Sequence, residues 1–295
     1  MKINVVTHMR LPLAILAALA AVSLSAQTPL IDQGRAAISR GDTDAAIDLL
    51  EKAVAQSPKS AEAHFYLATA YESAGGKSGM FGAAKWVPKL KDEYEKTVAL
   101  NPKYVDARFA LVGFYAVAPG MMGGSYDKAF EQAKEIKATD PIVGHRAYAL
   151  IYAQQTKPDL AKKEYVDAIR EQPKSPKAHS YFGQYLADAE KNYTAAAAEF
   201  EMALKADPNY MPAFYYLGRT AAQANTNFAR GEEALKKYVP YTPKYGEPAR
   251  ANTYYWLGMV NEKQGRKAEA KQNFEAALKL NPTLKQAGEA LKRVQ

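Results

Sequence analysis

The sequence predicts an all-α protein, a solenoid of about seven helix pairs followed by a single closing helix. Three observations predict it: apolar residues recur at helical spacing, the pattern repeats along the chain, and a proline follows each copy. The clearest copy runs from Ala251 to Pro282. Its two halves each place their core residues on one helical face: Tyr254, Leu257, Gly258 and Asn261, then Ala270, Phe274 and Ala277. The small residues let two helix backbones approach, and Phe274 fills the space between them.

The same small–large–small spacing precedes six other prolines, strictly in some copies and loosely in others. Counting back twelve, eight and five residues from each proline gives the corresponding triplets. They are Ala46, Leu50, Ala53; Leu90, Tyr94, Thr97; Ala129, Ala133, Ile136; Ala161, Tyr165, Ala168; Ala196, Phe200, Ala203; and Gly231, Leu235, Tyr238. Seven copies in one register indicate helix pairs that each bury a face only against their neighbours.

Each copy resembles a tetratricopeptide repeat, a helix–turn–helix unit of about 34 residues. Gly258, Ala270, Phe274, Ala277 and Pro282 carry the resemblance in the last copy, and it extends over roughly residues 28–284. The resemblance implies a right-handed α-solenoid. Together with the N-terminus described next, it points to an exported bacterial protein of this type.

The N-terminus has the layout of a cleaved secretory signal peptide. Lys2 and Arg10 precede the apolar run from Leu11 to Val22, and small residues follow up to Ala26. An uncleaved anchor is the alternative, but the run has 12 residues whereas a span needs about 20. We therefore expect a signal peptide over 1–26, a repeat solenoid over 27–282 and a capping helix over 283–295. The mature protein is expected in the periplasm or cell envelope, with no transmembrane span after cleavage.

Taken in order, repeats two, three and six depart from the standard length. Repeat two has ten extra residues between its helices, around 75–86, and repeat three has five, within 118–125. Both inserts combine glycine with large apolar residues, and we expect Pro88 to begin the second helix of repeat two. Two interpretations stay open: the inserts pack on each other, or they form an apolar ledge for a partner. Repeat six ends in a connector over 238–248 that three prolines keep from being helical.

No residue pattern predicts catalysis, a metal or a nucleotide. The absence of cysteine excludes disulfides and thiolate metal sites. Gly75–Ser78 resembles the end of a phosphate-binding loop, but Tyr71 stands where the first glycine is needed. Lysines and arginines are spread along the chain rather than clustered, which argues against nucleic acid. Three histidines occupy one recurring first-helix slot, where packing between repeats explains them: His64, His145 and His179.

The resemblance implies that partner peptides bind the concave surface, which the first helices line. Mapped onto this chain, that surface shows Thr69, Ser180 and eight side chains that are the candidate binding residues: Phe65, Phe109, Arg146, Gln184, Tyr215, Arg219, Tyr255 and Met259. The inserts supply a second candidate surface: Met80, Phe81, Trp86, Met121 and Met122. Aromatic and arginine side chains are favoured at binding surfaces. The Lys/Asn clamp that some family members use for chaperone C-termini does not appear, since Ile31 and Arg35 occupy its start.

Together these patterns predict a non-catalytic exported scaffold without cofactor or metal that binds a partner protein or peptide. A second function stays open, binding of a glycan or cell-wall fragment through the tyrosines. An enzyme would need paired acid and base groups or a nucleophile, and the pattern supplies neither.

Overall fold

The computed structural model describes residues 29–295, apart from the side chains of residues 80, 81 and 83, and every regular element in that range is a helix. A helix that reaches residue 40 comes first. It is followed by α2 (Thr43–Gln56), α3 (Ala61–Lys77), α4 (Gly79–Leu100), α5 (Val105–Val117), the 3-10 turn η1 (Gly120–Met122), α6 (Tyr126–Thr139), α7 (Pro141–Gln154), α8 (Pro158–Glu171), α9 (Pro176–Asp188), α10 (Tyr193–Ala206), α11 (Met211–Ala224), α12 (Phe228–Tyr238), α13 (Arg250–Lys263), α14 (Lys267–Leu280) and α15 (Lys285–Val294). The predicted signal peptide over 1–26 lies outside the described residues.

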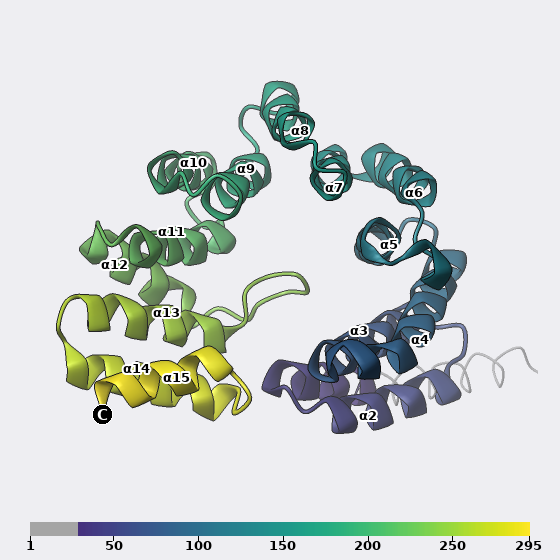
Figure 1. Ribbon diagram of the computed structural model, residues 1–295, viewed down its shortest axis with the longest axis horizontal. Helices are drawn as coiled ribbons and strands as arrows, with labels where there is room; N and C mark the ends of the chain where they lie inside the picture. The colour runs from purple at the N-terminus through teal and green to yellow at the C-terminus, as the bar shows by residue number, and fades with distance from the viewer. Residues whose placement is uncertain (1–28) are drawn as a thin grey trace, which may run out of the picture.

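Seven helix pairs follow one another around a curved arc, as Figure 1 shows. The first helix and α2 form repeat one, α3 and α4 form repeat two, and so on to α13 and α14 in repeat seven. The first helix of each pair faces the inside of the arc, and α15 packs on α13 and α14 at the end. The predicted fold class, an all-α solenoid of helix pairs, is confirmed.

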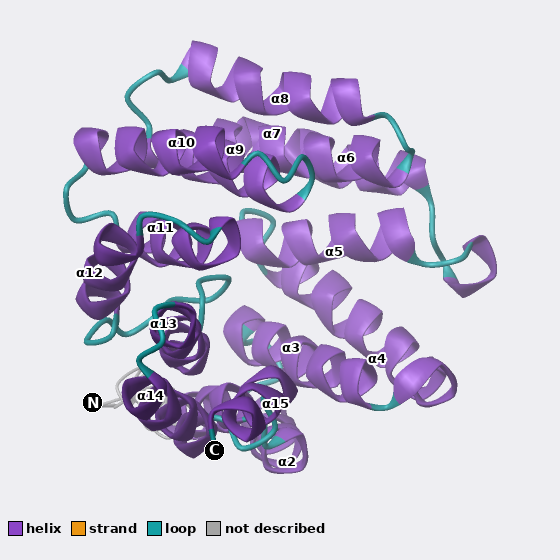
Figure 2. Ribbon diagram, turned by 60° about the vertical axis from the view of Figure 1, so that its left-hand side comes forward, coloured by secondary structure: helices purple, strands orange, loops and turns teal. Residues whose placement is uncertain are grey.

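The arc curls until its two ends touch. Gly41, in the turn of repeat one, lies against Asn281 and Thr283 in the turn between α14 and α15. A Cβ placed on Gly41 would lie 2.6 Å from the Thr283 hydroxyl, and Gly41 has a φ of +74° that only glycine adopts easily. Figures 1 and 2 both show α2 beside α15. The repeats therefore form a closed ring around the inside of the arc.

Local chemistry explains where the helices begin. Side chains of Ser60, Ser125 and Ser175 accept hydrogen bonds from backbone N–H groups in the first turns of α3, α6 and α9. Such N-caps satisfy donors that the helix itself leaves unpaired. Prolines also open several helices, because the first helical position needs no donor. They are Pro141, Pro158 and Pro176.

The core is a repeated contact between a first-helix glycine and a large second-helix side chain. A Cβ on Gly258 would lie 2.4 Å from the Phe274 ring, and one on Gly183 would lie 2.7 Å from the Phe200 ring. Both rings are fully buried. Because a methyl group has no room at these glycines, the spacing predicted from sequence is a steric requirement of the helix pair.

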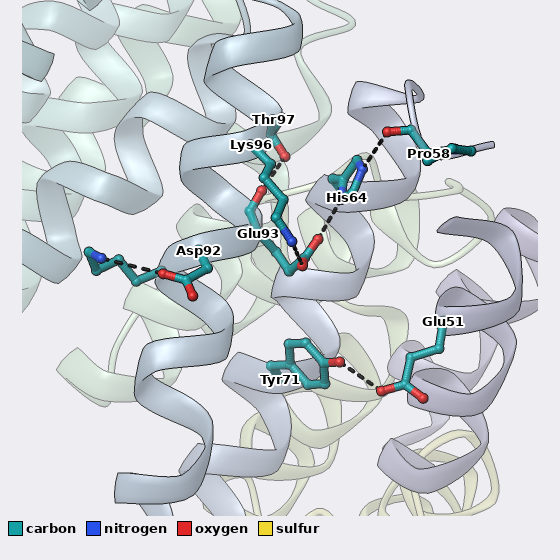
Figure 3. Close-up of polar contacts among 9 residues, drawn as sticks. Glu51, Pro58, His64, Tyr71, Asp92, Glu93, Lys96 and Thr97 are labelled. Atoms are coloured by element: carbon teal, nitrogen blue, oxygen red, sulfur yellow. Dashed lines mark hydrogen bonds and ion pairs between the residues drawn. The ribbon is translucent and has the colours of Figure 1, made fainter. Parts of the chain in front are cut away.

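The three histidines are structural. In repeat two, His64 contacts Glu93 on α4 through Nδ1 and the Pro58 carbonyl, 3.0 Å away, through Nε2 (Figure 3). His179 repeats this arrangement, with Glu199 Oε2 at 2.7 Å from Nδ1 and the Pro173 carbonyl at 3.0 Å from Nε2.

These hydrogen bonds also shift the titration of the histidines. The hydrogen bond to glutamate raises the pKa of both His64 and His179, against the lowering effect of burial. His145 is paired in the same way with Glu164, 2.7 Å from its Nδ1, and its pKa is raised for the same reason. In the described part of the chain, no group of histidines and acids is arranged to hold a metal.

The extra residues of repeat two lengthen its helices instead of forming a loop. Residues 75–86, the repeat-two extension, lie within α3 and α4 apart from a turn at Ser78, and the expectation that Pro88 begins α4 was wrong. Trp86 stacks on Tyr71 with 5.5 Å between ring centroids and donates to Ser78 Oγ at 3.3 Å. These contacts tie the two lengthened helices together, which is why the added residues continue the helices.

The repeat-three insert, residues 118–125, is a tight turn around η1. Gly124 packs so closely that a Cβ there would lie 1.7 Å from the Ala118 carbonyl oxygen, and Gly123 has a φ of +95°. Both glycines are therefore required by the backbone path.

Across the residues that the structure describes, no helix is both long and apolar enough to cross a membrane.

Candidate functional site

The candidate site is a cavity of about 960 Å³ on the inside of the arc, here called the concave cavity. Its walls come from α3 and α4, from the first helices of repeats three to six, from the repeat-three insert, and from the connector between α12 and α13. Its lining is mainly aromatic and aliphatic with a few charged groups, a composition common in ligand-binding cavities. The aromatic members are Tyr94, Phe109, Phe114, Tyr181, Tyr210, Tyr216 and Tyr245, and the charged members are Glu72, Asp106, Arg146, Lys177, Lys244 and Glu247.

One wall of the cavity is the connector at residues 239–249, here called the crossing loop. Figure 1 shows it leaving the end of α12 and reaching into the middle of the arc. The buried Tyr238 hydroxyl donates to the Pro248 carbonyl at 2.7 Å, and this hydrogen bond holds the part of the loop that returns to α13. Gly246, with a φ of +75°, makes the bend at its tip.

The tip of the loop reaches repeats two and three on the opposite side of the arc. The Tyr245 ring meets the Phe65 ring edge-on at 4.5 Å, in a cluster that also holds Tyr94 and Tyr104. Burial raises the pKa of Tyr245. The loop therefore bridges repeat six and repeat two and divides the inside of the arc.

Arg146 lines the cavity from α7. Its guanidinium sits 4.7 Å from the ring centroid of Phe109 on α5 and 4.5 Å from that of Tyr181 on α9. Three consecutive first helices thus hold one cation between two aromatic rings. Such cation–π contacts fix the orientation of an arginine without using its N–H groups.

Two further charged groups face the same space. Lys177 pairs with Asp140 at 2.8 Å. Asp106 is exposed to the interior of the cavity but surrounded by protein, and this burial raises its pKa, while Lys177 and Arg146 act in the opposite direction.

The structure divides the eight side chains expected on the concave surface. Phe109, Arg146 and Gln184 line the cavity. The other five do not: Phe65, Tyr215, Arg219, Tyr255 and Met259.

Physical reasons separate these five from the cavity. Phe65 is fully buried beneath Tyr245, so its expected exposure is corrected. Tyr215 is 5% exposed because its hydroxyl accepts a hydrogen bond from Trp256 Nε1 at 3.0 Å in the next repeat. Arg219 is bound to Asp188 at 2.7 Å.

Tyr255 and Met259 pack at the closing end of the solenoid. Both border the small cluster that α15 completes. The Arg293 side chain of α15 donates to Met259 Sδ at 3.6 Å.

The candidate binding residues of the inserts also have different surroundings. Trp86 stacks on Tyr71, Met121 is 94% exposed, and Met122 lines the rim of the cavity. The side chains of Met80 and Phe81 lie outside the described residues. Trp86 is thus held by its own helix pair, and whether the inserts form one apolar ledge stays a prediction.

Sequence reasoning missed Tyr181, Tyr210, Tyr216 and Tyr245. Tyr181 and Tyr216 each follow directly after a position that was assigned to the concave face, so the inward side of the helix is wider than one residue per turn. Tyr245 carried a signal of its own: an aromatic residue between prolines in an over-long connector is unusual for a surface turn.

Comparison with known proteins agrees with this architecture. A tetratricopeptide repeat model matches residues 31–76 and 147–210, and a second tetratricopeptide repeat model matches residues 251–284. The first segment of this match ends at residue 76, just inside the repeat-two extension. No curated protein matches the sequence.

Three solved structures are similar in fold. The yeast Tom70 structure has 16% identity and a TM-score of 0.55, with 85% of this chain and 59% of that chain covered. A monomeric IFIT1 mutant with Gppp-AAAA has 18% identity and a TM-score of 0.53, covering 86% and 58%. The APC/C hetero-tetramer Cut9–Hcn1 has 14% identity and a TM-score of 0.51, covering 88% and 47%.

The chain therefore spans about half to three-fifths of these chains, and the likeness concerns the fold alone. The chain contains tetratricopeptide repeats, and its fold is a tetratricopeptide-repeat solenoid.

Proposed function

We propose that this protein is a non-catalytic exported scaffold that holds an extended segment of a partner protein in the concave cavity. The observation that carries the proposal is the cavity itself, about 960 Å³ lined by consecutive first helices and closed by the crossing loop. Tetratricopeptide-repeat folds generally mediate protein–protein interaction, and this cavity lies on the concave face that the first helices line.

The crossing loop supports an extended ligand. It is itself an irregular stretch of chain that lies across the concave face and places one aromatic side chain, Tyr245, in an aromatic cluster. The inside of the arc therefore has the width and chemistry to accept peptide backbone. Its mixture of aromatic walls and a few charged groups suits a peptide better than a purely apolar or purely charged ligand.

A photo-cross-linking amino acid at Gln184 tests this site. Gln184 faces the cavity from α9, and the exposed Lys205 on α10 is the matched control on a second helix. We expect a specific protein to be cross-linked from position 184 and not from position 205. Cross-linking from 205 alone, or from neither position in cells that express the protein normally, contradicts the concave site.

Binding of a glycan or cell-wall fragment is the second candidate, supported by the aromatic faces of Phe109, Tyr181 and Tyr216 in the cavity. Soluble cell-wall fragments distinguish the two. A change in tyrosine fluorescence with the fragments, together with no cross-linked protein at position 184, favours the glycan.

Export is the other part of the proposal. It rests on the charged, apolar and small-residue segments of the first 26 residues. Cell fractionation with mass spectrometry of the N-terminus should find a mature chain that begins near Gln27 among soluble envelope proteins. An intact Met1 on membrane-bound protein favours an uncleaved anchor instead.

A further inference from the structure

Among the partly buried arginines of residues 29–295, Arg146 alone has no carboxylate partner. The others are paired within 4.0 Å: Arg35 with Asp32, Arg108 with Glu135, Arg219 with Asp188, Arg230 with Glu201, and Arg266 with Glu232. No carboxylate oxygen of the described residues lies within 4.0 Å of the Arg146 guanidinium, and it donates no hydrogen bond within them.

The surroundings of Arg146 leave its N–H edge free for a ligand. Phe109 and Tyr181 cover the guanidinium at 4.7 and 4.5 Å from their centroids, and the side chain lines the cavity. A planar guanidinium held between rings can use its outward N–H groups together, which is the geometry that binds an oxyanion with two parallel hydrogen bonds. Leaving these donors without a protein acceptor inside an aromatic cavity is costly unless water or a ligand accepts from them.

The charge balance of the cavity limits the ligand to a single negative charge at Arg146. Its lining has three cations, Arg146, Lys177 and Lys244, against three carboxylates, Glu72, Asp106 and Glu247. Lys177 is already paired with Asp140. A doubly charged phosphate would meet repulsion from the three carboxylates, whereas one carboxylate can be neutralised by Arg146 alone.

We propose that Arg146 is the anchoring residue of the cavity and binds the carboxylate of an acidic side chain in the partner segment, next to aromatic or apolar residues of that segment. This inference rests on the proposed function and names the chemistry that the cavity recognises. Asp106, which faces the same space, opposes the ligand carboxylate and sets how strongly the acidic group is held.

Two blocked tripeptides test the proposal: one has glutamate between two phenylalanines, and the other has glutamine in its place. Binding is measured by NMR titration of backbone amides, which also locates it. We expect the glutamate peptide to shift signals of α5, α7 and α9 and to bind at least tenfold more tightly than the glutamine peptide.

Four variants locate the effect on Arg146. Arg146→Gln should reduce the preference for glutamate to about one, and Arg146→Lys should lose most of it, because lysine keeps the charge but not the planar fork. Asp106→Asn should strengthen the preference. Arg219→Gln is the matched control, since Arg219 also lies over a tyrosine, at 5.0 Å from the Tyr216 centroid, but is paired with Asp188. It should leave the preference unchanged. Melting temperatures of all four variants report any loss of fold.

The outcomes separate this inference from the proposed function. Equal binding of both peptides in the cavity, or binding of neither, overturns the role of Arg146, and so does tighter binding of inorganic phosphate than of the glutamate peptide. The cross-link at position 184 is independent of these titrations. Its failure overturns the function, and its success with no glutamate preference overturns only the role of Arg146.

Discussion

The repeat-two extension and the crossing loop are both additions to standard repeats, yet the first becomes part of a helix pair and the second crosses the inside of the arc. The extension lies between the two helices of one pair, and its residues continue α3 and α4 until Trp86 stacks on Tyr71. The crossing loop lies between two pairs, and it leaves α12, crosses the inside of the arc and brings Tyr245 to Phe65.

The difference teaches that the point of attachment limits what an addition can do. Residues added within a pair can extend its helices, because both ends stay antiparallel and in contact. Residues added between pairs start at the concave edge, and three prolines prevent them from joining either helix. The first kind of addition therefore strengthens one repeat, whereas the second changes the shape of the binding surface.

The free energy of unfolding lost with a repeat core residue is the reference for the losses expected at the two additions. Phe274→Ala should lower the free energy of unfolding by about 3–5 kcal/mol, because the ring is fully buried against Gly258. Urea denaturation followed by circular dichroism measures it. A cost below about 1 kcal/mol would mean that the helix pair does not depend on this contact.

Removing the Tyr245 ring, which anchors the crossing loop, should lower the free energy of unfolding by less than the loss of a core residue and by more than the loss of Trp86 in the extension. Tyr245→Ala is expected to lower the free energy of unfolding by about 2–3 kcal/mol, since the ring is partly exposed but packs in an aromatic cluster. Tyr245→Phe, which keeps the ring, should stay within about 1 kcal/mol of the wild type. If Tyr245→Ala matches the wild type in the same denaturation experiment, the loop does not rest on repeat two.

The extension should be the less sensitive addition. Trp86→Ala is expected to cost about 1–2 kcal/mol, because Trp86 is half-buried and its main partner is the Tyr71 ring. Trp86→Phe should recover most of the loss. A cost equal to that of Phe274→Ala would place the extension in the core and remove the contrast between the two additions.

The smallest expected effect is the change in stability when the histidine–glutamate pairs titrate. It should be the same in repeat two, which carries the extension, and in repeat five, which carries no addition. The hydrogen bonds to Glu93 and Glu199 raise the pKa of His64 and His179 in the folded state. The resulting stabilisation is complete below the ordinary histidine pKa of about 6.5 and is lost as pH rises through the raised value.

The stability advantage of the wild type over His179→Gln should therefore shrink between pH 6 and pH 9. Denaturation midpoints at several pH values measure this, and His64→Gln in repeat two serves as the parallel case. An advantage that grows with pH contradicts the assignment.

The periodicity of the sequence was sufficient to predict the repeats because the contact between the small and the large core residue is made within one pair. The Gly258–Phe274 contact, for example, joins residues of one repeat. The same periodicity placed Phe109, Arg146 and Gln184 on the inner face, where they line the cavity.

Contacts between different repeats could not be predicted in this way. Tyr215 is buried because Trp256 of the next repeat hydrogen-bonds to it, and Phe65 is buried by a loop from repeat six. Neither partner is fixed by a local pattern, since the first contact depends on how neighbouring repeats stack and the second on how far the arc curls. For the same reason the repeat pattern showed a long connector but not its path across the cavity.

The central claim is that the partner lies in the concave cavity, and filling that cavity tests it most directly. Gly113 lines the cavity from α5 with no atom within 4 Å of a Cβ placed there, so Gly113→Trp adds a large ring to the open space. Gly288 on α15 is equally open but lies outside the lining, and Gly288→Trp is the matched control. Capture of the protein cross-linked from position 184 should fall at least tenfold in Gly113→Trp and stay at the wild-type level in Gly288→Trp. Undiminished capture by a folded Gly113→Trp variant would contradict the account.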